Sequence, residues 1–468
     1  MSRRLLIEAE PGEWRVALVE DGALLEFRLV RLVGGSRVGE LFSGRVVRGL
    51  PALRAVLVDI GLARPAHLSL DDALSKSQAA ALHEGAGITV QVKRDPRADK
   101  AAGVTMRLRL GGTYLDWLPA RPGLRVDLLE EQQRERVAAL LSRAMQQGEG
   151  IAARPSAALV SETELQFEVA VLRARWAAIE EKRRVAEPPA LLEAVEPIAD
   201  FVRELVDGVD AVVIDDAVAF GMVRLSLQRE RPALLDRLQR HRGAVSLFQS
   251  EDIADAVAAL TARRVRLPGG GALEIAPTAA AVLIDVDSGG LAQEQHLGDE
   301  ALLTLNLAAA TVIARQIRLR GLAGALVVDF VALARKEHRT RLLESFRSAL
   351  RAEVPEAQLL GWTRLGHVEL TRPRRHAALH EIVFETNAEG QRIKTPLTVA
   401  LEALATASSV AETERMHRIL LRVHPRVAAV LKGEAASVLG SLEARSGGRI
   451  ELAVEPSRAQ ESFAIERG

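Results

Sequence analysis

The chain has 468 residues, 48% of them hydrophobic, and its 62 Lys and Arg balance its 62 Asp and Glu. A chain of this length and composition buries a sizeable core in several domains, which excludes an intrinsically disordered protein. Zero net charge leaves any attraction to nucleic acid to local basic patches. The absence of Cys excludes disulfides, thiolate chemistry and zinc sites built on Cys, and it fits a reducing compartment.

The N-terminal residues are expected to form antiparallel strands. The alternating segments LLIEAE, EWRVALVE and ALLEFRLV are separated by Pro11-Gly12 and Asp21-Gly22, and Asp-Gly between such segments is a strong hairpin signal. Residues 39–118 continue in short strands with turn residues between them. This spacing predicts a small closed barrel.

Helical periodicity begins after the barrel region. It covers residues 126–186, a mixed region, and ends at Pro188-Pro189. Farther along, residues 264–277 predict a hairpin about a Pro-Gly-Gly-Gly turn. The strand VLIDVDS, a long amphipathic helix and the strand GALVVDF follow, and this order predicts a parallel crossover unit. From residue 395 the tail predicts a small domain of helices and the strand RIELAV.

Two segments bear on the location of the protein. The N-terminal residues reach Glu8 before the apolar core of a signal peptide could form. The longest apolar helical stretch, residues 301–314, is shorter than the roughly 18 residues that a membrane span needs. We therefore expect a cytoplasmic protein without membrane contact.

Carboxylates end both strands of the predicted crossover unit. Asp285 and Asp287 share one face of the first strand, because successive side chains alternate, and Asp329 leaves the second strand in the same way. Neighbouring strands would bring the three together at the carboxyl edge of the sheet. Oxygen ligands suit Mg²⁺, with Mn²⁺ as the alternative, and such an ion activates water against a phosphodiester. The competing interpretation is that Asp285 or Ser288 caps a nearby helix.

The segment around these acids resembles the catalytic core of the ribonuclease E/G family. IDVDSGG and, at 305–331, LNLAAATVIARQIRLRGLAGALVVDFV are similar to the family's order of a strand with Asp-x-Asn-Ser, a helix ending in ARQLRLR and a strand with an Asp. The similarity extends to residues 44–61, 95–119 and 245–271 and to the tail RILLRVHPRVAAVLKGE. It therefore covers nearly the whole chain.

The resemblance implies an α/β multidomain fold. An RNase H-like part would be split by an inserted OB-fold RNA-binding domain and a sensor-like domain, and a DNase I-like catalytic domain and a small C-terminal domain would follow. The implied boundaries are 1–38 and 199–261 for the RNase H-like part, 39–118 for the OB-fold, 119–198 for the sensor-like domain, 262–380 for the catalytic domain and 395–468 for the C-terminal domain.

The resemblance also implies a magnesium-dependent endoribonuclease that cuts single-stranded RNA, with Asp285 and Asp329 as metal ligands. Asp287 departs from the family's Asn. It is expected either as an additional ligand and catalytic acid or as a change that weakens the site, because a carboxylate repels phosphate unless a cation intervenes. The residues expected to contact RNA are Lys100, Gly112 and Arg154.

Other departures affect recognition of RNA. Arg154 matches the Arg of the family's five-prime monophosphate sensor, but Pro155 replaces its Thr and lacks both a hydroxyl and a backbone N–H. Asp116 replaces an apolar residue there and would repel phosphate. Leu57 and His67 stand where the family's barrel has stacking Phe, so base stacking should be poorer. We expect weak or absent sensing of five-prime monophosphate.

The departures keep a second function open, that of a catalytically impaired RNA-binding paralogue. Retention of Asp285 and Asp329 argues against it, since an inactive site has no need of two acids side by side. The family's zinc link through a pair of Cys cannot form in this chain. A homo-oligomer would therefore need another interface.

Overall fold

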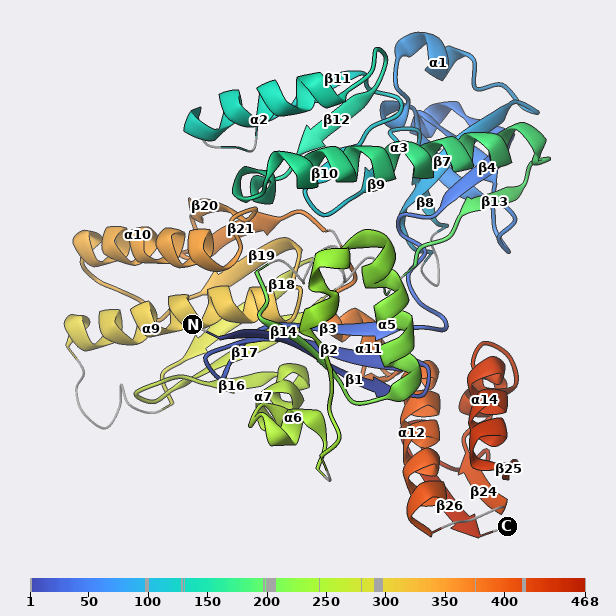
Figure 1. Ribbon diagram of the computed structural model, residues 1–468. Coiled ribbons are helices and arrows are strands. Elements are labelled where there is room, and N and C mark those ends of the chain that lie inside the picture. The colour runs from blue at the N-terminus through green and yellow to red at the C-terminus, as the bar shows by residue number, and fades with distance from the viewer. Residues whose placement is uncertain are drawn as a thin grey trace. The chain divides into compact units, whose positions relative to one another are not determined.

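The structure is a computed structural model of a mixed α/β protein (Figure 1). It describes residues 2–96, 101–127, 129, 131–196, 198, 208–243, 245–278, 280–289, 298–374, 376–414 and 418–467. The chain divides into two compact units. One unit is Met1–Gly35, Gly208–Gly221 and Asp236–Gly468, and the other is Ser36–Asp207 and Met222–Leu235.

The first unit contains a five-stranded sheet built on the predicted N-terminal hairpins, which are confirmed. Asp21 and Gly22 have φ of 47° and 80°, the two positive values that a tight hairpin turn requires. Two later strands add in parallel beside the first, and helices α6 (Leu247–Ser250) and α7 (Ala254–Ala258) contribute to the apolar core of this region. The strand order is β15 (Leu238–Arg240), β14 (Ala211–Ile214), β1 (Arg3–Glu10), β2 (Glu13–Glu20) and β3 (Ala23–Arg31).

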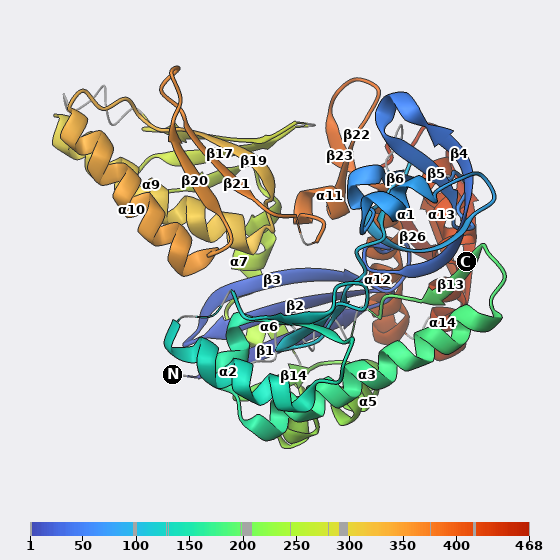
Figure 2. The same cartoon turned by 90° about the horizontal axis from the view of Figure 1, so that it is seen from above.

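A six-stranded sheet forms the second layer of this unit, and helices α9 (Asp299–Leu319) and α10 (Lys336–Glu353) lie side by side along it (Figures 1 and 2). The predicted parallel crossover is confirmed, since α9 joins two adjacent parallel strands. The predicted hairpin at 264–277 also pairs. The strand order is β16 (Arg264–Arg266), β17 (Ala272–Pro277), β18 (Val282–Asp287), β19 (Gly324–Asp329), β21 (Val368–Arg372) and β20 (Gln358–Trp362).

Helix α9 is the core helix of this layer. Its 21 residues extend beyond the apolar stretch seen in the sequence, and by length and composition it could cross a membrane. Half of its most apolar window is buried, however, and Ala310, Ile313 and Ile317 are completely inaccessible in the core beneath the sheet. Burial against the sheet therefore accounts for its apolar character.

The remainder of the first unit is small and C-terminal. Helix α11 (Leu379–Val383) leads into a hairpin of β22 (Phe384–Thr386) and β23 (Arg392–Lys394). Beyond it, three helices share a core with a three-stranded sheet. The helices are α12 (Pro396–Glu414), α13 (Pro425–Lys432) and α14 (Ala436–Ser446), and the strand order is β25 (Arg449–Val454), β24 (Arg418–Val423) and β26 (Phe463–Arg467).

The second unit contains the predicted barrel, which is confirmed as a closed five-stranded barrel consistent with an OB-fold. Pairing of the first strand with the fourth closes it, so that it has no free edge. Apolar side chains such as Phe42, Val58 and Val90 fill its interior. The strands are β4 (Leu41–Leu50), β5 (Ala55–Asp59), β6 (Ala66–Ser69), β7 (Gly87–Arg94) and β8 (Gly103–Thr105), with β13 (Ala190–Glu193) added beside β4 and helix α1 (Lys76–Ala80) in the β6–β7 connection.

A four-stranded sheet with two helices completes the second unit. Helix α3 (Glu162–Val185) begins with a capping box in which Ser161 and Glu164 satisfy each other's backbone N–H groups. The other elements are α2 (Glu131–Ala144) and the strands β11 (Gly123–Arg125), β12 (Gly150–Ala153), β10 (Leu115–Trp117) and β9 (Leu110–Gly111), in that order across the sheet. Helix α5 (Ala217–Glu230) belongs to both units.

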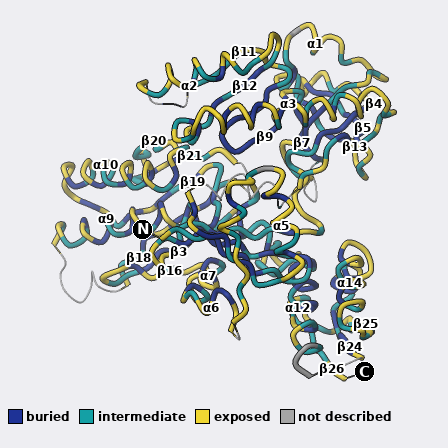
Figure 3. Tube along the Cα trace, in the orientation of Figure 1, coloured by how far each residue is buried: buried dark blue, intermediate teal, exposed yellow. Residues whose placement is uncertain are grey.

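Burial differs along the chain (Figure 3): the longer strands β1, β2 and β4 contain runs of buried residues, whereas the edge strands β16 and β20 have no buried residue and the long helices α3 and α10 have an exposed outer face. The division into RNase H-like, sensor-like and DNase I-like domains with the boundaries given above stays a prediction.

Candidate active site

The carboxylates of Asp285 and Asp329 lie on neighbouring strands at the same level. Strands β18 and β19 are parallel, and their register pairs Asp285 with Asp329 directly. Along β18 the residues Val282, Ile284 and Val286 are buried, whereas Asp285 between them is exposed. The apolar face therefore packs into the core with α9, and the acids stand on the opposite face of the sheet.

Ionisable side chains also lie beside Asp285 and Asp329 on the strands at each side. On β17, Glu274 pairs with Asp285. On the far side, the register of β19 and β21 brings His367 beside Asp329, with its Nε2 3.7 Å from Asp329 Oδ2. Four ionisable side chains thus form a row across the sheet: Glu274 on β17, Asp285 on β18, Asp329 on β19 and His367 directly before β21. Sequence reasoning missed Glu274 and His367, because strand register cannot be read from spacing alone.

The crowding of acids changes the proton affinity of Asp285. Its pKa is raised above the ordinary aspartate value, first by partial burial and then by the negative charges of Asp329, Asp287 and Glu274. Carboxylates that disfavour each other's ionisation accept a cation between them readily, since the cation removes the repulsion.

Asp287 is held by a different set of contacts. Its Oδ1 accepts the N–H of Gly289 at 2.8 Å, and its Oδ2 accepts a hydrogen bond from Arg264 Nη2 at 2.7 Å. These contacts lower the pKa of Asp287, the Gly289 N–H most and Arg264 next. Gly289 lies in a turn and has φ of 64°, a backbone conformation that favours glycine. Gly290 lies outside the described residues.

The donor set fits a hard cation. Within the described part of the chain, no three His, Asp or Glu side chains converge closely enough to hold a metal ion alone. Asp285 and Asp329 nevertheless supply two adjacent carboxylates on an exposed face, and Mg²⁺ in proteins is usually bound by one or two carboxylates while it keeps several waters.

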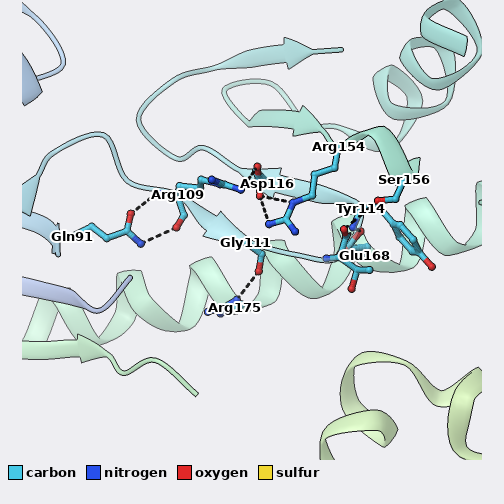
Figure 4. A network of polar contacts seen from close by, with 10 residues as sticks. Gln91, Arg109, Gly111, Tyr114, Asp116, Arg154, Ser156, Glu168 and Arg175 are labelled. Atoms are coloured by element: carbon cyan, nitrogen blue, oxygen red, sulfur yellow. Dashed lines mark hydrogen bonds and ion pairs between the residues drawn. The ribbon is translucent and has the colours of Figure 1, made fainter. Parts of the chain in front are cut away.

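The residues matched to the five-prime sensor come together in the second unit (Figure 4). Arg154, which follows β12, donates from Nε and Nη2 to Asp116 Oδ1 on β10, at 3.1 and 2.8 Å. Arg109 Nη2 lies 2.8 Å from the other oxygen, Asp116 Oδ2. As a whole residue Asp116 is 9% exposed, so one mostly buried carboxylate is shared by both guanidinium groups.

Beside this pair lies a buried acid that sequence reasoning missed, Glu168 on α3. Its carboxylate accepts the backbone N–H groups of Thr113 and Tyr114, and burial raises its pKa to about 7. Gly112 is buried against it, and a Cβ at Gly112 would lie 2.4 Å from Glu168 Oε1. This packing accounts for the glycine, and an RNA contact at Gly112 stays a prediction. Within the charged helix nothing in the sequence distinguished Glu168.

On the barrel, the register aligns Arg48, Leu57 and His67 across three neighbouring strands. Leu57 and His67 are half-buried and Arg48 is exposed. The departures from stacking Phe therefore lie next to each other on one patch of the barrel surface. Lys100, which the resemblance assigned to RNA contact, lies outside the described residues.

Comparison with known proteins identifies the family. Residues 110–375 match the model of the Ribonuclease E/G family, and the chain belongs to that family, as its motifs predicted. It is 28% identical to Ribonuclease G of Escherichia coli K12 over 487 residues, with 99% of each chain covered. The identity to Ribonuclease G of Haemophilus influenzae is also 28%, with 98% of each covered. Ribonuclease E of Haemophilus influenzae is 28% identical over 99% of this chain and 51% of its own length.

Proposed function

We propose that the protein is an endoribonuclease that cleaves single-stranded RNA in RNA processing or decay, with Mg²⁺ held by Asp285 and Asp329. The observation that carries this proposal is the register pair of two exposed acids on adjacent parallel strands, inside the segment that matches the family. Mn²⁺ is the alternative cation, since it accepts the same oxygen ligands.

The ion and the residues of the chain would have different roles in cleavage. A bound ion supplies an activated water and offsets negative charge on the scissile phosphate. The chain's own residues orient the reacting groups. Asp285 and Asp329 hold the ion, and Asp287 lies two residues further along β18, as an additional ligand or as an acid that keeps Arg264 in place beside the phosphate.

RNA would be bound by contacts that carry little sequence information. Within the barrel, Arg48, Leu57 and His67 form a surface against which a base of single-stranded RNA can rest. Lys100 and Arg154 were assigned as RNA contacts, but Arg154 is already paired with Asp116. We propose for this reason that recognition of five-prime monophosphate is weak or absent. We also propose a cytoplasmic location and, for any homo-oligomer, an interface other than a zinc link.

The second candidate is an RNA-binding paralogue with impaired catalysis. The observation that favours it is the ion pair of Asp287 with Arg264, which places a negative charge and an occupied Arg where the family has a neutral amide. The two candidates differ in whether the protein cuts the RNA that it binds.

Cleavage of a short fluorogenic single-stranded RNA with Mg²⁺ tests the proposal. The native protein should cut it, and Asp329→Asn should abolish cleavage while RNA binding persists. Glu369→Gln is the matched control, because Glu369 is an exposed acid of the same sheet on β21 that lies outside the row. Asp287→Asn shows whether that acid assists: we expect slower cleavage. Binding without cleavage by the native protein, together with cleavage restored by Asp287→Asn, would establish the impaired paralogue instead.

A further inference from the structure

One polar side chain of α9 has no part in the surface of the protein. Asn306 is 0% exposed and lies in a helix whose buried residues are otherwise apolar, among them Leu303 and Ala310. An amide in such surroundings is unfavourable unless hydrogen bonds satisfy it, and Asn is a weak helix former. The hydrogen bonds of Asn306 must therefore compensate for burying its amide in the core.

Both bonds go to the backbone of one residue, Val331. Asn306 Nδ2 donates to the carbonyl oxygen of Val331 at 2.8 Å, and Asn306 Oδ1 accepts the N–H of Val331 at 3.1 Å. Because the backbone N–H only donates and the carbonyl only accepts, the amide orientation is fixed. Val331 comes two residues after Asp329, the last residue of β19. Asn306 thus pairs with the chain just beyond the end of the strand.

A second contact from the same helix secures the next part of this segment. Asp299 Oδ1 accepts the N–H of Ala334 at 2.9 Å, and Asp299 Oδ2 lies 2.5 Å from His338 Nδ1. Residues 299 and 306 are two helical turns apart and therefore lie on the same side of α9. The connection from β19 to α10 is held to α9 at both ends.

We propose that Asn306 is a positioning residue for Asp329. This inference rests on the proposed function, because it gives Asp329 its role as a ligand. The side chain of Asp329 is 57% exposed, so its direction depends largely on the backbone on either side of it, including the residues that follow the strand. By fixing Val331, Asn306 keeps the carboxylate of Asp329 level with that of Asp285. Displacement of a catalytic group by about 1 Å slows a reaction by roughly 100-fold.

Asn306→Leu is the test, because leucine has a similar size and makes neither bond. Three experiments are made: the dissociation constant of Mg²⁺ is obtained from its effect on the melting temperature, kcat and KM are measured on the fluorogenic RNA, and hydrogen exchange is followed at residue 331. We expect weaker Mg²⁺ binding, a kcat lower by roughly 10- to 100-fold with KM for RNA nearly unchanged, and faster exchange. Ile313→Ala is the matched control: it removes a buried side chain of the same helix that has no group able to hydrogen-bond to the segment.

The control separates positioning from plain loss of stability. If Ile313→Ala lowers kcat and Mg²⁺ affinity as much as Asn306→Leu does, the inference is wrong. It is also wrong if Asn306→Leu binds Mg²⁺ and turns over like the native protein. Should Asn306→Leu fail to fold, Asn306→Asp keeps the acceptor for Val331 N–H, loses the donor, and is expected to give the same split between kcat and KM. A native protein that neither binds Mg²⁺ nor cuts RNA overturns the proposed function and this inference together.

Discussion

Replacement of Asp116 by Ala should both destabilise the protein and uncover an anion site. In the native chain Asp116 accepts two hydrogen bonds from Arg154 and contacts Arg109. The side chains of Asp116 and Arg154 are 13% and 17% exposed. Removing one partner of a buried ion pair costs about 3–5 kcal/mol, and the residual exposure places this pair at the lower end, near 3 kcal/mol.

The assay is urea unfolding of Asp116→Ala beside Asp71→Ala. Asp71 pairs with Arg54 in the same unit, but their side chains are 77% and 74% exposed. An exposed pair contributes about 0–1 kcal/mol, so the control should change little. Inorganic phosphate is then added to both variants. It should restore part of the lost stability in Asp116→Ala, since a ligand at 100 times its Kd adds about 2.7 kcal/mol, and it should do nothing for the native protein.

Two results would refute this reasoning. If Asp116→Ala lost no more stability than Asp71→Ala, the buried pair would not be an important contact. If phosphate stabilised the native protein as much as the variant, the Asp116 carboxylate would not prevent an anion from binding Arg154, and the proposal of weak five-prime sensing would be wrong. A five-prime monophosphorylated RNA would then be cut faster by the native protein than its hydroxyl counterpart.

Two further predictions concern titration and metal binding. Glu168 has a pKa raised to about 7 by burial, so its protonation stabilises the fold: this contribution is complete below about pH 4.5 and is lost as the pH rises through 7. In urea unfolding, the free energy of unfolding of the native protein should fall by about 3 kcal/mol over that pH window through Glu168, and Glu168→Gln should lack this fall. The same pH profile in both proteins would mean that Glu168 ionises freely. Mg²⁺ at about 100 times its Kd should raise the unfolding free energy of the native protein by about 2.7 kcal/mol and that of Asp329→Asn by much less, and equal gains would place the ion elsewhere.

Turn dipeptides and the alternation of apolar and polar residues predicted the hairpins and the outward-facing side chains correctly. Asp21-Gly22 predicted a hairpin because both residues tolerate positive φ, and the turn has that geometry. Alternation around Asp285 predicted which side chains face outward, and the crossover order predicted that β18 and β19 are neighbours. The family motifs added the carboxylate pair. All of these depend on residues close together in the chain or on a topology with few alternatives.

Long-range contacts supplied what the sequence could not. Helical periodicity covers the mixed region 126–186, but it does not show that β12 lies within this region and pairs with β10 and β11. Glu168 and Asn306 have unremarkable helical neighbours, and their importance comes from backbone groups 54 and 25 residues away. Glu274 and His367 join the row of ionisable side chains through strand register, which is decided by the packing of the whole sheet.

In the six-stranded sheet, the alternation of apolar and acidic residues along β18 and β19 determines both the packing of the core and the position of the acids. Ile284 and Val286 flank Asp285, and Val328 precedes Asp329, so a slip of either strand by one residue would turn carboxylates into the core and apolar side chains into water. Each of these apolar side chains favours burial by about 1.5–3 kcal/mol, which makes such a slip far more costly than the repulsion between neighbouring acids. The hydrophobic face with α9 and α10 thus holds Asp285 opposite Asp329 against their mutual repulsion. The amide of Asn306 extends this control one step past the strand, where β pairing ends.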